Sequence, residues 1–192
     1  MVQYICDVLD TFCSFLRFYL EGLFVFKVGD LVVYGNNGVC TVDSIGPSSL
    51  SGADRSKDYY FLTPYYSGKC KIMIPCDNDR IVMRALITKD EANALIEDLD
   101  NISLMEITDE KSREQIYKNV IRGCDCREMF SLIKTIYLRK QTRLSEGKKV
   151  TSSDEKYFLI AEDKLYGELA VALGIEKNDI KDYIKSRTGM DK

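Results

Sequence analysis

The residue types that most often carry catalysis or hold metal ions are missing from this sequence or lack the necessary spacing. The 192 residues contain no histidine, which excludes histidine triads, Cys–His dyads and histidine metal sites. The seven cysteines are irregularly spaced and form no Cys-x-x-Cys pair, so they indicate neither a zinc site nor a disulfide scaffold. We expect reduced, mostly buried thiols in a cytoplasmic protein.

The acidic clusters also lack the companions that metal or acid–base chemistry requires. Residues 77–79 resemble the start of a calcium loop, but no glycine and distal glutamate follow at the required spacing. Glu155, Glu162 and Glu168 share one expected helix without the histidine partners of a carboxylate metal site. An enzyme would therefore need a carboxylate, lysine or thiol mechanism, and the sequence indicates no pocket for one.

Charge is distributed unevenly along the chain. Hydrophobic residues make up 45% and charged residues 30%, which is typical of a globular protein. The net charge of −3 excludes a globally basic nucleic-acid-binding coat, yet residues 111–149 hold 11 basic and only 4 acidic residues. Such a block indicates phosphate contacts, and a solvated helix face is the alternative explanation.

Two interpretations of residues 1–24 stay open. Four charged residues interrupt this apolar stretch, so it is neither a signal peptide nor a membrane span. It has the apolar stripe of an amphipathic helix. Alternatively, Glu21-Gly22 corresponds to a purine-rich codon pair like a ribosome-binding site and Val25 to a GTG start codon, so that residues 1–24 form an extension outside the authentic protein.

The periodicity of apolar residues divides the rest of the chain into two parts. Turn signals at residues 36–38 and 46–56 separate β-branched and aromatic runs, which predict five strands at 30–34, 39–45, 59–63, 69–74 and 81–83. Helical periodicity then follows, with an expected N-cap at Thr88 and expected helices at 109–122, 125–146, 154–173 and 178–187. The expected fold class is α+β, with a small five-stranded barrel or bent sheet followed by an all-helical bundle.

Motifs in both parts resemble the CarD/CdnL family of bacterial transcription regulators, whose first module also occurs in transcription-repair coupling factor. They are FKVGDLVVYG at 26–35, GVC at 38–40, DEK at 109–111, CD at 124–125, IYLR at 136–139, DEK at 154–156 and GELA at 167–170. The resemblance implies a Tudor-like RNA polymerase-interaction domain at residues 25–87 and a helical DNA-contacting domain at 88–192. The first would bind the polymerase β subunit, and the second would contact promoter DNA to modulate open-complex stability. The family precedent is a monomer.

The resemblance also implies a docking strand for polymerase. Exposed strand edges recruit partner strands, and the strand expected at 69–74 is the candidate, with Lys69, Lys71 and Met73 as polymerase-binding residues. Lys71 and Met73 share one face because side chains alternate along a strand. Met73 occupies the position at which family members commonly carry an arginine.

The DNA contacts implied by the resemblance are phosphate contacts that position a protein without reading sequence. The expected DNA-binding residues are Arg113, Arg139, Lys140, Arg143, Lys148, Lys149 and Lys156. For Arg139, an ion pair inside the bundle is the alternative.

Family members also carry a tryptophan that wedges into the opening promoter, and this chain has no tryptophan. The matching region is Met105, Glu106 and Ile107, with Glu106 at the wedge position and its two neighbours as weaker substitutes. The missing tryptophan favours an alternative function, a small-barrel adaptor or RNA-associated binding protein without promoter-DNA contact. A steep salt dependence of promoter binding would distinguish the two functions.

Overall fold

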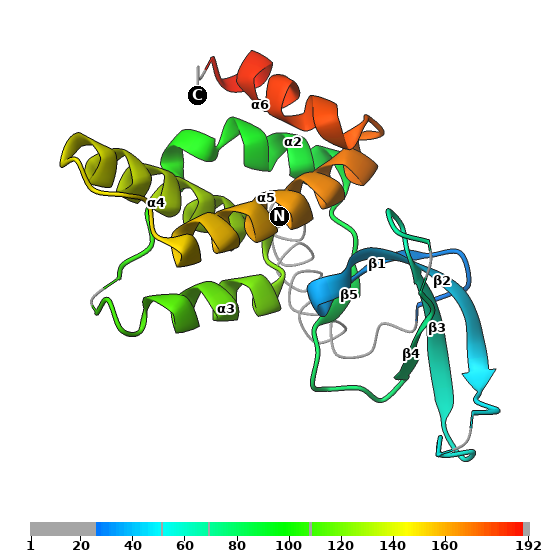
Figure 1. Ribbon diagram of the computed structural model, residues 1–192. Helices are drawn as coiled ribbons and strands as arrows, with labels where there is room; N and C mark the ends of the chain where they lie inside the picture. Colours follow the sequence, from blue (N-terminus) through cyan, green and yellow to red (C-terminus); the bar gives the residue numbers. More distant parts are fainter. Residues whose placement is uncertain (1–25, 51, 69, 108, 190–192) are drawn as a thin grey trace, which may run out of the picture.

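The computed structural model describes residues 26–50, 52–68, 70–107 and 109–189. In this part of the chain, a sheet lies to one side and the helices pack together on the other (Figure 1). The expectations for residues 1–24 concern a segment outside the described residues. None of the described helices has the length and apolar character needed to cross a bilayer.

The sheet has five antiparallel strands in the order β4-β3-β2-β1-β5. The strands are β1 Leu31–Tyr34, β2 Gly38–Pro47, β3 Asp58–Pro64, β4 Ile72–Pro75 and β5 Met83–Ala85. Because β4 and β5 lie at opposite ends of this order, the sheet is open and does not close into a barrel. The α+β class and the five strands are confirmed, and the bent sheet is the correct one of the two expected forms.

Two strand boundaries were predicted wrongly. The fourth strand begins at Ile72, not 69, and includes Pro75, which pairs with Tyr59. Proline is tolerated there because β4 is an edge strand and its missing N–H breaks no ladder. The fifth strand begins at Met83, not 81, and ends at Ala85, which pairs with Val32 of β1.

Both faces of the central strands are buried, since alternate residues point to opposite sides. Val32 and Val42 belong to the core of the sheet itself, together with Tyr34, Cys40, Tyr60, Leu62 and Ile74. On the other face, Val33 and Val39 lie close to Met129 of the helical part. The sheet is therefore joined to the helices by packing and not only by the chain.

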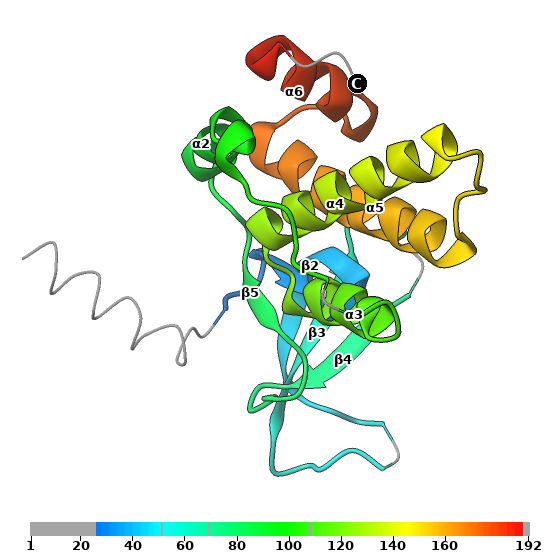
Figure 2. The same cartoon turned by 90° about the vertical axis from the view of Figure 1, so that its left-hand side faces the viewer.

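Five α-helices form the second part: α2 Lys89–Glu97, α3 Arg113–Gly123, α4 Cys126–Ser145, α5 Ser152–Leu173 and α6 Ile180–Thr188. In Figure 2, α2, α4, α5 and α6 lie above the sheet, whereas α3 is at the level of the strands. Thr88 caps α2 in a capping box with Glu91, and Asp125 and Thr151 cap α4 and α5 with their side chains. Their core centres on α5, whose Ala161, Leu165 and Leu169 are fully buried.

Helix α3 differs from its prediction at both ends. The helix expected at 109–122 begins only at Arg113, and the chain reverses at Cys124 (φ 56°) and not at Gly123. Asp125 must adopt an extended backbone to cap α4, so the residue before it takes the left-handed conformation that turns the chain. This places the Cys124 carbonyl at the junction with the sheet.

Candidate polymerase and DNA interfaces

The β4 edge is the free edge of the sheet among the described residues. Ile72 and Ile74 belong to or pack against the sheet core, whereas Met73 lies opposite Phe61 on the other face. Lys71 immediately precedes the strand, with its side chain 78% exposed and its Nζ 3.9 Å from Asp43 Oδ2. Lys69 lies outside the described residues. The structure thus places Lys71 and Met73 at an accessible edge that can accept a partner strand.

The turn that leads into β4 is tied to α5. The hydroxyl of Tyr66 donates a hydrogen bond to the carbonyl of Gly167 at 2.8 Å. Lys177 Nζ lies 4.8 Å from the centre of the Tyr66 ring, which is a cation–π contact. A side chain larger than glycine at 167 would crowd that ring, since a Cβ there would lie 3.1 Å from a ring carbon. The edge therefore has a fixed position relative to the helices.

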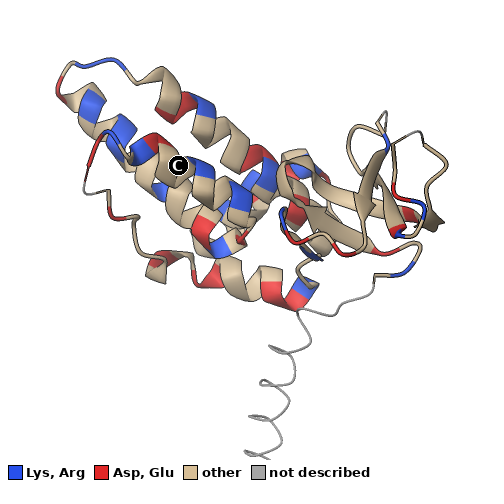
Figure 3. Ribbon diagram, turned by 90° about the horizontal axis from the view of Figure 1, so that it is seen from below, with Lys and Arg blue, Asp and Glu red and all other residues tan. Residues whose placement is uncertain are grey.

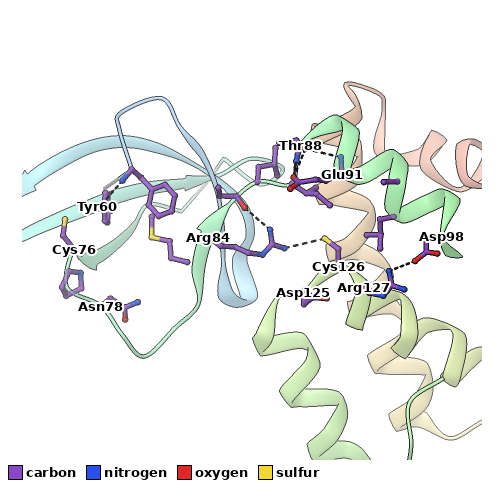
Figure 4. Close-up of a pocket in the computed structure, with 18 residues that line it drawn as sticks. Tyr60, Cys76, Asn78, Arg84, Thr88, Glu91, Asp98, Asp125, Cys126 and Arg127 are labelled. Carbon is purple, nitrogen blue, oxygen red and sulfur yellow. Dashed lines mark hydrogen bonds and ion pairs between the residues drawn. The ribbon is translucent and has the colours of Figure 1, made fainter. Parts of the chain in front are cut away.

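The β5 edge, in contrast, is tied to the helical part through Arg84, whose side chain points toward Cys126 in Figure 4, and a buried ion pair holds this side chain. The Arg84 guanidinium donates to both carboxylate oxygens of Glu168, at 2.6 and 2.7 Å, and Glu168 is only 2% exposed. Arg84 also donates through Nε and a second nitrogen to the carbonyl of Cys124. Burial opposes the charge of Arg84, but the hydrogen bonds and charge of Glu168 outweigh it and raise the pKa of Arg84.

A second set of contacts fixes the turn between β1 and β2. Lys164 Nζ donates to the Asn36 carbonyl at 2.5 Å, and Cys124 Sγ lies 3.3 Å from the Gly35 carbonyl. Burial lowers the pKa of Lys164. Gly35 has a φ of 42°, and a Cβ there would lie 2.5 Å from a methyl carbon of Ile81, so this position requires glycine.

Sequence reasoning missed this junction. The segment GELA at 167–170 supported the resemblance, but nothing in it assigned a role to Glu168. Arg84 and Glu168 lie far apart in the sequence, and a pair so distant leaves no local pattern to recognise.

An open groove of about 1160 Å³ lies between the sheet and helices α2 and α4. Tyr60 and Met83 line its sheet side, and Leu95 and Arg127 line its helical side. Arg127 forms an ion pair with Asp98 at 2.7 Å. The described residues contain no group of three or more potential metal ligands, in this groove or elsewhere. The groove presents paired charges and apolar side chains.

Two of the expected DNA-binding arginines are engaged inside the helical part. Arg113 forms an ion pair with Glu110 and lies 3.3 Å from the fully buried Asp154, and only 13% of its side chain is exposed. Arg139 binds Glu110 at 2.8 Å, and its hydrogen bond is the main cause of the lowered pKa of Glu110. Tyr117 donates a hydrogen bond to Asp154 at 3.1 Å. These arginines hold α3, α4 and α5 together, which is the alternative raised for Arg139.

The other expected DNA-binding residues lie at the surface, mainly where α4 meets α5 (Figure 3). Lys140 and Lys149 are exposed. Arg143 Nε donates to the carbonyl of Lys149 at 2.9 Å, which leaves the Lys149 ammonium at the surface. Lys148 pairs with Glu146 at 2.7 Å. Lys156 lies further along α5, with its Nζ 5.3 Å from the centre of the Tyr157 ring.

The wedge region presents a carboxylate and not an apolar side chain. Met105 and Ile107 pack against the core of the helical part, and the Met105 N–H donates to Thr135 Oγ1 at 2.8 Å. Glu106 between them is exposed. Of Met105, Glu106 and Ile107, the exposed residue is therefore Glu106, and the apolar Leu104 before them is 49% exposed.

The sheet part therefore has the form of a small protein-interaction module. Among the described residues its β4 edge is free, and its β5 edge is fixed to the helices of the same chain. Comparison with known proteins identifies it further: residues 26–87 match the family model for the CarD-like/TRCF RID domain. This match spans all five strands. The chain thus carries an RNA polymerase-interaction domain of the CarD-like family, shared with TRCF, and its function is related to transcription through RNA polymerase.

Proposed function

We propose that the protein is a CarD-like regulator that binds the β subunit of RNA polymerase through the β4 edge and contacts promoter DNA through its helical part, modulating open-complex stability. Residues 25–87 form the polymerase-interaction domain and residues 88–192 the DNA-contacting domain. The protein acts as a monomer and as a binding factor, without a cofactor or a catalytic step.

The main support for the proposed polymerase contact is that β4 is the free edge of the sheet among the described residues. An unpaired strand edge offers backbone hydrogen bonds to an extended partner segment, and the side chains beside it decide which partner fits. Lys71 supplies an exposed positive charge directly before β4, and Met73 lies within the strand opposite Phe61. Lys69, outside the described residues, is the third proposed polymerase-binding residue.

Polymerase binding is tested by capture of the full-length chain on the isolated β-subunit lobe of the host polymerase. We expect stoichiometric binding, and we expect Lys71→Glu to weaken it at least about tenfold, since like charges in a contact are unfavourable. Lys89→Glu reverses an exposed charge on α2, away from the edge, and serves as the control. Equal affinity of the two variants would refute docking through β4.

The DNA contact is supported by the cations that remain free of the bundle: Lys140, Arg143, Lys148, Lys149 and Lys156. They have no arrangement for reading bases, so we propose phosphate contacts that are strong only in the complex with polymerase. The open-complex lifetime at a promoter measures the result. Glu106→Trp would place an apolar side chain at the exposed wedge position, and we expect it to lengthen that lifetime.

One observation favours a second function, an adaptor or RNA-associated factor without promoter-DNA contact. The exposed carboxylate of Glu106 repels phosphate at the wedge position. If this function holds, salt will affect the affinity for promoter complexes no more than the affinity for polymerase alone.

A further inference from the structure

A basic groove runs between α3 and α5. Of the expected DNA-binding residues, Lys156 is the one that lines it. It has a volume of about 620 Å³, and Asn36 of the β1–β2 turn lies at its end. Four cations line it, two from each helix: Lys118, Arg122, Lys156 and Lys164. Its lining contains a single acidic residue, Asp163.

The cations of this groove are less neutralised than those inside the bundle. Arg122 is exposed and has no ion-pair partner in the described part of the chain. Lys118 Nζ forms an ion pair with Glu114 Oε1 at 2.9 Å, and 42% of the Lys118 side chain is exposed. The acid of the groove, Asp163, is bound at 2.5 Å by Lys177. The groove therefore has an excess of positive charge.

Lys164 has a different role from the other three cations. Its ammonium is already hydrogen-bonded to the Asn36 carbonyl at 2.5 Å. It adds positive potential to the groove but has no freedom to follow a ligand. Arg122, Lys118 and Lys156 are left as the contacting groups.

We propose that the α3–α5 groove holds the phosphate backbone of one DNA strand, with Arg122 and Lys118 contacting phosphates beside Lys156. This inference rests on the proposed DNA contact and extends it from the α4–α5 connection toward the sheet. Lys156 and Lys164 are eight residues apart, which is about 12 Å along the helix. A groove of that length can contact more than one phosphate of a strand.

The lining of the groove fits nucleic acid better than an acidic amphipathic helix of another protein. A helix bound in a groove needs several apolar anchors. Ile121 and Tyr157 are each only 5% exposed, so they offer such a partner little surface. Leu159, at 57% exposed, is the one strongly exposed apolar side chain of the lining, and one anchor is too few.

The test compares the double variant Lys118→Ser/Arg122→Ser with the double variant Lys89→Ser/Lys181→Ser, which removes two exposed cations from α2 and α6. Full-length chains are titrated onto polymerase alone and onto polymerase–promoter open complexes over a range of KCl concentrations. Removal of one phosphate contact lowers the slope of log affinity against log salt by about 0.9. We expect the groove variant to lower the slope by about 2 for open complexes and to leave the slope for polymerase alone unchanged.

A third variant, Lys148→Ser/Lys149→Ser, separates failure of this inference from failure of the proposed function. If it lowers the slope while the groove variant matches its control, DNA contact stands and the groove inference is overturned. If the wild-type slopes with and without DNA are the same, the promoter contact itself is refuted. If the groove variant binds DNA-free polymerase more weakly, the groove holds a protein segment, which also overturns the inference. Circular dichroism verifies that each variant is folded.

Discussion

The two edges of the sheet are both short antiparallel strands, but they differ in how they contact the rest of the molecule. At β5, Arg84 donates to Glu168 and to the Cys124 carbonyl, so this edge is part of the junction with the helices. At β4, Lys71 has only a 3.9 Å contact with Asp43, and the strand ends the sheet. One edge thus fixes the sheet on the helical part, and the other stays available for a partner.

The β5 junction and the Tyr66–Gly167 contact fix the direction of the β4 edge relative to the helices. If polymerase binds at β4, as we propose, this fixed direction would also set where the helical part lies along the promoter.

The largest expected effect on stability comes from breaking the Arg84–Glu168 ion pair at the β5 edge. Glu168→Ala leaves the Arg84 charge without its partner in a poorly solvated site, and removing one partner of a buried pair costs about 3–5 kcal/mol. We expect the free energy of unfolding in urea to fall by that amount. The double variant Arg84→Met/Glu168→Leu, which removes both charges, should recover most of the loss. A decrease below about 1 kcal/mol in the single variant would show that the ion pair does not hold the junction.

Thiol reactivity compares the two edges directly. Cys70 and Cys76 flank β4 and are exposed, whereas three cysteines at or near the junction are buried: Cys40, Cys124 and Cys126. Burial raises the pKa of Cys40 to about 11, which leaves little thiolate to react at about pH 8. We expect iodoacetamide to modify the buried thiols on the order of 100-fold more slowly than Cys70.

Mass spectrometry of the native protein over time measures these rates, and the unfolded protein is the control. Cys76 should react more slowly than Cys70, because burial and nearby carboxylates raise the pKa of its thiol. Equal rates at Cys70 and Cys124 would contradict a closed junction.

A smaller effect is expected where the turn before β4 meets α5. Tyr66→Phe removes the hydrogen bond to the Gly167 carbonyl, and such a bond contributes about 1 kcal/mol. We expect the melting temperature to fall by a few degrees, while the isolated polymerase lobe is bound with unchanged affinity. Tyr65→Phe, on the neighbouring exposed ring, is the matched control. Weaker lobe binding by the Tyr66 variant would mean that the turn itself is part of the docking surface.

The smallest expected effect is a gain at the free edge. Met73→Arg restores the residue type that related domains commonly carry at this position, and a new exposed ion pair contributes about 0.2–1 kcal/mol. We expect affinity for the polymerase lobe to rise up to about fivefold, measured by calorimetry, with stability unchanged. Met73→Gln controls for removal of the apolar side chain. Weaker binding of the arginine variant than of the glutamine variant would place Met73 in an apolar contact instead.

The sequence predicted those features that local physics determines. Thr88 was identifiable as a helix cap because its side-chain chemistry acts within one helical turn. The five strands followed from alternation and turn signals. Local rules could not decide between a closed barrel and an open sheet, since that depends on whether β4 reaches β5.

The candidate site was less predictable, because it depends on contacts between distant residues. The family resemblance placed Arg113 among the DNA-binding residues, whereas Asp154 and Glu110 engage it inside the helical part. The basic block around it can be read from the sequence, but only the tertiary structure distinguishes the ion-paired Arg113 and Arg139 from cations such as Arg122 that are exposed.

Polymerase binding at β4 and not at β5 can be tested by site-specific photo-crosslinking. A benzophenone amino acid replaces Lys71 at one edge, or the exposed Ala85 at the other, in the full-length chain mixed with host RNA polymerase. We expect a crosslink to the β subunit from position 71 and none from position 85. A β-subunit crosslink from position 85 without one from position 71 would contradict docking through the free edge.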